Sequence, residues 1–102
     1  MADFVLAMAM SELLPGSCRE VTVEGRSLAL YNVAGKVYAT SNSCLHRGGP
    51  LGQGALDGCT VYCPWHTWAF DVRTGVCPDN PDLRLAIYEV MVEDGQVMVR
   101  VE

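Results

Sequence analysis

Two short segments, Cys44-Leu45-His46 and Cys63-Pro64-Trp65-His66, carry the side chains best suited to bind a metal. Sixteen residues separate His46 from Cys63, and each segment offers one thiolate and one imidazole. Two cysteines and two histidines are the ligand set of a [2Fe–2S] cluster in which imidazoles replace thiolates on one iron. They are also a tetrahedral ligand set for zinc. The spacing therefore predicts a metal centre.

The arrangement of these ligands favours iron over zinc. Zinc sites of this composition usually pair cysteine with cysteine and histidine with histidine, whereas here each segment gives one of each. Residues 43–54 include four glycines and a proline, and glycine permits the close backbone approach that a compact inorganic cluster requires. Zinc stays the main alternative. A disulfide between Cys44 and Cys63 is a weaker one, because such bonds are rare in the cytosol.

The two segments resemble the Rieske family, whose motif is Cys-x-His, a spacer of about this length, and Cys-x-x-His. The similarity continues through residues 46–51, 63–71 and 73–75, and the chain is about as long as a stand-alone Rieske ferredoxin. The resemblance implies one Rieske-type [2Fe–2S] cluster per chain, with Cys44 and Cys63 on the inner iron. It places His46 and His66 on the outer iron, near the protein surface.

Departures from the family pattern bear on the reduction potential. High-potential Rieske proteins carry an extra disulfide at positions that are Gly49 and Trp65 here, and hydroxyl donors at positions that are Trp68 and Phe70. Without those donors the reduced, more negative cluster is less stabilised, so we expect a potential of roughly −150 mV, the low end for such clusters. Thr67 replaces the glycine that commonly follows the second histidine. It either strains the loop or supplies a substitute hydroxyl.

Length and charge limit the other possibilities. A chain of 102 residues is expected to form a single domain (1–102) with a modest core. Seven Lys and Arg against twelve Asp and Glu give a net charge of −5, with no basic cluster that would bind nucleic acid. The apolar runs are too short to span a bilayer, and residues 4–8 lack the features of a signal peptide. We therefore expect a cytoplasmic protein that binds no membrane.

The hydrophobic pattern predicts an all-β fold. Apolar residues alternate with period two, and turn signals interrupt them every eight to twelve residues. The expected strands are 4–8, 18–23, 27–33, 37–40, 68–72, 85–92 and 96–101, with a hairpin at 55–62. A helical turn capped by Ser11 is expected at 11–14, and a stiff loop at 77–81. Resemblance implies the Rieske fold, an antiparallel sandwich or barrel base with an inserted cluster-binding subdomain at about 42–70.

The side chains around the motif are assigned to packing or to docking. Cys18, Cys59 and Cys77 are expected to be packed thiols and not ligands. Trp68 and Phe70 are expected in the core, and Asp79 and Asp82 in solvent. The residues that flank the ligands are Leu45, Arg47, Pro50, Leu51, Pro64 and Trp65, and several of them are expected to be exposed around the outer histidines. Trp65 is expected to pack over the cluster and also to offer an apolar contact to redox partners.

The histidine count argues against an enzyme. A Rieske oxygenase needs a second iron held by two histidines and a carboxylate, and this chain has only the two histidines of the motif. No nucleotide-binding fingerprint is present. We therefore expect a one-electron carrier between a flavin-dependent, NAD(P)H-oxidising ferredoxin reductase and a terminal oxygenase. The alternatives are a Rieske-like small subunit that joins the large subunit of an assimilatory nitrite reductase, and a zinc-holding interaction module.

Overall fold

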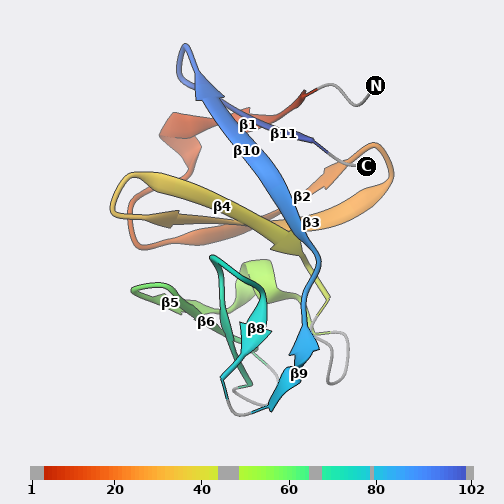
Figure 1. Cartoon of the computed structure of the whole chain (residues 1–102). Helices are drawn as coiled ribbons and strands as arrows, with labels where there is room; N and C mark the ends of the chain where they lie inside the picture. Colours follow the sequence, from red (N-terminus) through yellow and green to blue (C-terminus); the bar gives the residue numbers. More distant parts are fainter. Residues whose placement is uncertain (1–3, 44–48, 65–67, 79, 101–102) are drawn as a thin grey trace.

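The computed structural model describes residues 4–43, 49–64, 68–78 and 80–100 (Figure 1). Within them the elements are eleven strands and two short 3-10 turns. The strands are β1 (Val5–Ala9), β2 (Cys18–Val23), β3 (Arg26–Val33), β4 (Lys36–Ser41), β5 (Ala55–Asp57), β6 (Thr60–Tyr62), β7 (Ala69–Asp71), β8 (Val76–Cys77), β9 (Asn80–Arg84), β10 (Ile87–Glu93) and β11 (Gln96–Arg100). The turns are η1 (Met10–Glu12) and η2 (Leu51–Gln53). The all-β prediction is confirmed.

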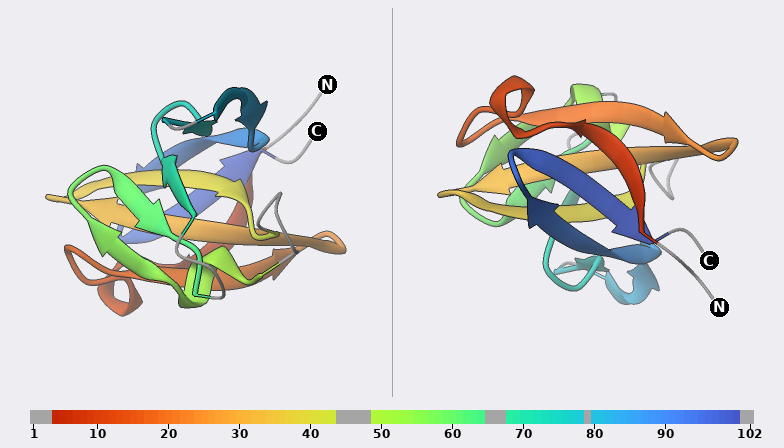
Figure 2. Two further views of the ribbon diagram at one scale, coloured as in Figure 1. Left: turned by 90° about the horizontal axis from the view of Figure 1, so that it is seen from below. Right: turned by 90° about the horizontal axis from the view of Figure 1, so that it is seen from above.

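Six antiparallel strands form the base of the molecule, in the order β1-β11-β10-β4-β3-β2. Strand β10 pairs with β4 through Ile87 and Tyr88 and with β11 over its remaining length. The outer strands β1 and β2 contact each other, so the sheet curls toward a barrel (Figure 2). Among the described residues, no helix is long and apolar enough to cross a membrane.

Three base hairpins turn through a residue pair with positive φ at both positions. The pairs are Glu24-Gly25, Ala34-Gly35 and Asp94-Gly95, with φ values between 49° and 96°. This is the turn whose twist matches that of paired strands, and glycine at the second position takes it without steric cost. All three pairs lie in the gaps between the expected strands, at 24–26, 34–36 and 93–95, and this part of the predicted hairpin pattern is confirmed.

A smaller unit lies below the base in Figure 1. It contains the three-stranded sheet β5-β6-β7, the two-stranded sheet β8-β9 and the turn η2. The predicted hairpin at 55–62 is present as β5 and β6, with Leu56 opposite Val61. The predicted stiff loop at 77–81 is wrong in part, because Val76 and Cys77 pair with β9, where Pro81 lies on a two-stranded edge that tolerates proline.

The helical turn differs from its prediction in position and in capping. The turn begins at Met10, one residue before the expected Ser11, and its N-cap residue is Ala9 without a side-chain hydrogen bond. Ser11 therefore lies inside the turn and does not cap it. The backbone of Met10 instead donates to the carbonyl of Gly95, which ties the turn to the terminal hairpin.

Strand β3 separates two hydrophobic cores because its residues alternate between the two faces of the sheet. Leu28 and Leu30 pack toward β1, β4 and β11, within the base. Ala29 and Tyr31 face the other way and pack with Leu51, Val61, Cys63, Phe70, Val72, Cys77 and Leu85. We call this second group the lower core. It joins the base to the smaller unit, and it includes Cys63, the first residue of the second ligand segment.

Candidate metal centre

Cys63 is the one predicted ligand among the described residues, and it follows β6 directly. Period-two alternation places Val61 and Cys63 on the same face of that strand, pointing into the lower core. Only 2% of the Cys63 surface is exposed, and its thiol forms no disulfide. A buried, unpaired thiol at the start of a tight loop is suited to bind iron or zinc in place of water.

The second ligand segment is closed by a backbone hydrogen bond. The amide of Cys63 donates to the carbonyl of Trp68 at 2.8 Å. Phe70 is fully buried and Trp68 packs, half-buried, against the lower core, which confirms their expected packing. The two ends of the segment, Cys63 and Trp68, therefore both contact the lower core.

The first ligand segment is closed in a similar way. Ser43 and Pro50 form an isolated antiparallel bridge, and Leu51 then enters the lower core with no exposed surface. Leu51 is therefore not one of the exposed flanking residues, because η2 directs its side chain into the core. Pro50 is half-buried and Pro64 is exposed. Leu51 and Cys63 share one core, so both segments start from the same packed surface.

Three of the four predicted ligands, Cys44, His46 and His66, lie outside the described residues. The same holds for Leu45, Arg47, Trp65, Thr67 and Asp79. Within the described ranges, no three His, Cys, Asp or Glu side chains converge on a common point. The buried thiol of Cys63 and the closed ends of both segments fit a bound cluster.

The other described cysteines have packing roles. Cys77 is 3% exposed and lies in the lower core with Cys63, without a disulfide, as expected. Cys59 is half-buried against the same core. The half-buried thiol of Cys18 donates to the carbonyl of Gly54 at 3.3 Å. Burial raises the pKa of Cys18, which keeps this thiol protonated and poorly suited to bind metal.

The turn after β7 is braced by an ion pair. Asp71 accepts hydrogen bonds from the backbone amide of Arg73 at 2.8 Å and from its guanidinium at 2.8 and 3.1 Å. These bonds, led by the one from the guanidinium, hold the pKa of Asp71 below its usual range. Gly75 follows at φ 80°, where an added Cβ would lie 2.5 Å from the carbonyl of Leu85. The turn thus packs closely against Leu85, in the connection between β9 and β10.

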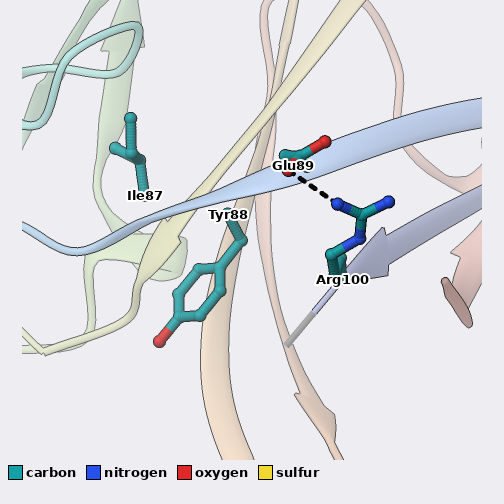
Figure 3. A pocket seen from close by; sticks show the side chains of 4 residues that line it. All are labelled: Ile87, Tyr88, Glu89 and Arg100. Carbon is teal, nitrogen blue, oxygen red and sulfur yellow. Dashed lines mark hydrogen bonds and ion pairs between the residues drawn. The ribbon is translucent and has the colours of Figure 1, made fainter. Parts of the chain in front are cut away.

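A separate hollow of about 230 Å³ lies on the base sheet, lined by Ile87, Tyr88, Glu89 and Arg100 (Figure 3). Glu89 accepts a hydrogen bond from Arg100 at 3.0 Å across β10 and β11. The guanidinium of Arg100 also lies 4.7 Å from the ring centre of Phe4. None of these residues is a predicted ligand, so the hollow is not part of the metal centre.

Comparison with known proteins decides the family. The Rieske [2Fe-2S] domain matches residues 3–89. The chain belongs to the Rieske family. A related protein, the ferredoxin component of the naphthalene 1,2-dioxygenase system of Pseudomonas putida, is 40% identical over 97 residues, which cover 94% of this chain and 93% of that protein. Family membership establishes a Rieske-type [2Fe–2S] cluster as the cofactor, and it favours this cluster over zinc at the metal centre.

Solved structures agree on the fold. The ferredoxin of carbazole 1,9a-dioxygenase from Nocardioides aromaticivorans superposes with a TM-score of 0.88 at 29% identity, over 97% of this chain and 98% of that one. A chain from the complex of reduced oxygenase and oxidised ferredoxin in carbazole 1,9a-dioxygenase gives a TM-score of 0.85 at 37% identity, over 95% and 92% of the two chains. The predicted Rieske fold is confirmed.

The relatives also identify the type of activity. They are named as ferredoxin components, so this Rieske protein is an electron carrier and not a catalytic component. The same names favour the carrier over a nitrite reductase subunit and over a zinc-holding module. When bound, the cluster accepts and releases a single electron. The described residues bury Cys63 in the lower core and hold the ends of both segments by hydrogen bonds.

Proposed function

We propose that this Rieske protein is the ferredoxin component of a multicomponent oxygenase system. It would take one electron at a time from an NAD(P)H-dependent flavin reductase and pass it to a terminal oxygenase. The full-length similarity to a dioxygenase ferredoxin component is the observation that carries the proposal. The similarity to a chain from a solved oxygenase–ferredoxin complex supports the oxygenase as electron acceptor.

The proposal includes the ligand assignment. We infer that Cys44 and Cys63 bind one iron and that His46 and His66 bind the other, within a cluster-binding subdomain at about 42–70 of a single domain, 1–102. The buried, unpaired thiol of Cys63 supports this assignment. The cytoplasm is the proposed location, because the described cysteines are all unpaired, as is usual in a reducing compartment.

Reconstitution tests the electron-carrier role. NADH, a flavin-dependent ferredoxin reductase and cytochrome c are mixed with and without the cluster-loaded protein, and cytochrome reduction is followed. We expect reduction to depend on the protein, and a terminal oxygenase to replace cytochrome c as acceptor. A stable complex with a nitrite reductase large subunit, together with no stimulation of cytochrome reduction, would contradict the proposal.

A pair of cysteine variants tests the ligand assignment. Cys63 and Cys77 are almost equally buried in the same core, so Cys63→Ser and Cys77→Ser disturb packing to a similar extent. We expect Cys63→Ser to lose the iron, the visible absorption and the electron paramagnetic resonance (EPR) signal of the reduced cluster. Cys77→Ser should keep all three. Retention of the cluster in Cys63→Ser, or its loss only in Cys77→Ser, would overturn the assignment.

A further inference from the structure

Asn42 joins the two ends of the first ligand segment. It precedes the Ser43–Pro50 bridge, and its carbonyl accepts a hydrogen bond from the amide of Leu51 at 2.7 Å. Its side-chain Oδ1 accepts a second from the amide of Gly52 at 2.7 Å. A single residue on the upstream side therefore binds two consecutive amides on the downstream side, across the base of the segment.

The same side chain is also fixed to the base sheet. Asn42 Nδ2 donates to Oε2 of Glu20 at 2.9 Å and to Oγ of Ser27 at 3.1 Å, and its backbone amide donates to the carbonyl of Ser27 at 3.0 Å. Only 6% of Asn42 is exposed. Both amide hydrogens and the amide oxygen of its side chain are used, which fixes the orientation of the group.

Glu20 provides a second connection between the base and the segment. Its Oε1 accepts from Nε2 of Gln53 at 2.6 Å, while its Oε2 accepts from Asn42. These bonds, first from Gln53 and then from Asn42, hold the pKa of Glu20 below its usual range, so the carboxylate stays an acceptor at neutral pH. One carboxylate on β2 thus bridges residues on both sides of the segment. We call Glu20, Ser27, Asn42 and Gln53 the loop clamp.

We infer that the loop clamp is a positioning device that sets the geometry of Cys44 and His46 at the cluster, acting through the ends of their segment. The inference rests on the proposed ligand assignment. Groups that hold metal ligands in orientation affect metal retention and redox properties even though they never touch the metal. The clamp holds the segment by side-chain bonds to a six-stranded sheet, so its ends are fixed without help from the metal.

The donor and acceptor pattern of the clamp allows a rescue experiment. Asn42→Asp replaces the Nδ2 donor with an oxygen that faces the Glu20 carboxylate, so attraction becomes repulsion. In the wild type both carboxylate oxygens of Glu20 accept hydrogen bonds, from Asn42 and from Gln53. Glu20→Gln replaces one of these oxygens with an NH2 group, which cannot accept, so one of the two bonds is lost. In the double variant the introduced amide donates to the introduced carboxylate and still accepts from Gln53, and the bond from Gly52 is kept. Both singles break the clamp, and the double variant restores it with reversed polarity.

Asn32 supplies a matched control. It is 1% exposed, its Nδ2 donates to the carbonyl of Leu13 at 2.7 Å, and its Oδ1 accepts from the amide of Gly35 at 2.7 Å. Asn32→Asp is therefore the same chemical change at an equally buried asparagine. It lies at the opposite end of β3 from Ser27, away from the first ligand segment. It reports the cost of a buried carboxylate without touching the clamp.

The experiment compares the cluster-loaded wild type with the four variants. It records the EPR spectrum of the reduced protein, the midpoint potential and the rate of iron release to a chelator. We expect Asn42→Asp to release iron at least about 10-fold faster, with a shifted potential and a broadened spectrum. Glu20→Gln, on the exposed side of the clamp, should change the same properties in the same direction. The double variant should return close to wild type, and Asn32→Asp should keep the wild-type spectrum and potential.

Two outcomes overturn the positioning role. One is that Asn42→Asp and Asn32→Asp give the same spectrum, potential and release rate. The other is that the double variant is no closer to wild type than the singles. If Asn42→Asp fails to take up the cluster, Glu20→Gln and the double variant decide. A wild-type protein that carries no cluster would defeat the proposed function, whereas a loaded wild type with unaffected clamp variants would defeat only this inference.

Discussion

Gly52 in η2 packs against Glu20 of β2, and Gly52→Ala is predicted to disrupt this contact. An added Cβ would lie 2.5 Å from the backbone nitrogen of Glu20 and 2.7 Å from its Cα. These are backbone atoms within a paired strand, so they cannot rotate aside. Relief requires η2 to move by about 1 Å, and close-packed interiors resist such displacement.

The magnitude follows from two costs. Overpacking of a rigid contact costs about 1–3 kcal/mol. A shift of this size also stretches the 2.7 Å bond between the Gly52 amide and Asn42 Oδ1 beyond a useful length, and an orphaned buried acceptor costs about 1–3 kcal/mol. A total of about 3 kcal/mol would lower the Tm of a domain of this size by more than about 10 °C.

Thermal unfolding of the cluster-loaded proteins at one fixed scan rate measures this effect. Gly58→Ala is the control, because Gly58 has φ 60° and nothing within 4 Å of its added Cβ. That variant bears only the cost of a left-handed alanine, about 1 kcal/mol, or about 4–8 °C. Equal losses in the two variants, or a Gly52→Ala protein as stable as wild type, would refute the reasoning about this contact.

Three further predictions concern the lower core, the turn after β7 and docking. Tyr31 is buried and its hydroxyl lies 2.8 Å from Oγ1 of Thr40, so Tyr31→Phe should cost about 1–2 kcal/mol in urea unfolding; no change would contradict a stabilising role for this bond. The lowered pKa of Asp71 means that its pair with Arg73 adds stability above the ordinary carboxyl pKa, and that this stability is lost as pH falls through the lowered value. Asp71→Asn should therefore reduce Tm near neutral pH and not at strongly acidic pH, and a loss of equal size at both would exclude the ion pair as the cause. Trp65→Ala should slow electron transfer to the oxygenase while the cluster stays intact, and unchanged rates would exclude Trp65 as a docking residue.

The base of the fold could be predicted from the sequence because its signals are local. Alternation in β2 and β3 and the residue pairs Glu24-Gly25 and Asp94-Gly95 determine strands and turns within a few residues of each other. The sequence predicts the helical turn one residue too late. Serine is a residue type that favours the N-cap position, but the position of this turn depends on the hydrogen bond from Met10 to Gly95. That bond joins residues far apart in the chain, and no local pattern reports it.

The loop clamp could not be predicted for a similar reason. Glu20 and Gln53 are both exposed, and nothing in the sequence around them distinguishes them from other surface residues. Their hydrogen bond joins positions that are 33 residues apart. Asn42 gave the only available signal, a polar residue between the end of a strand and the first ligand segment. The sequence does not indicate that Leu51 is the buried residue among those that flank the ligands, because its neighbours are glycine and proline and the turn of η2 directs its side chain inward.

The reduction potential of the cluster-loaded protein tests the central claim most directly. Voltammetry between about pH 6 and about pH 10 should give a reversible wave near roughly −150 mV at neutral pH. The potential should stay level and then fall at alkaline pH, because imidazole ligands lose protons more readily in the oxidised protein. A potential that is hundreds of millivolts higher, or the absence of a reversible wave in fully metallated protein, would contradict a histidine-ligated, low-potential electron carrier.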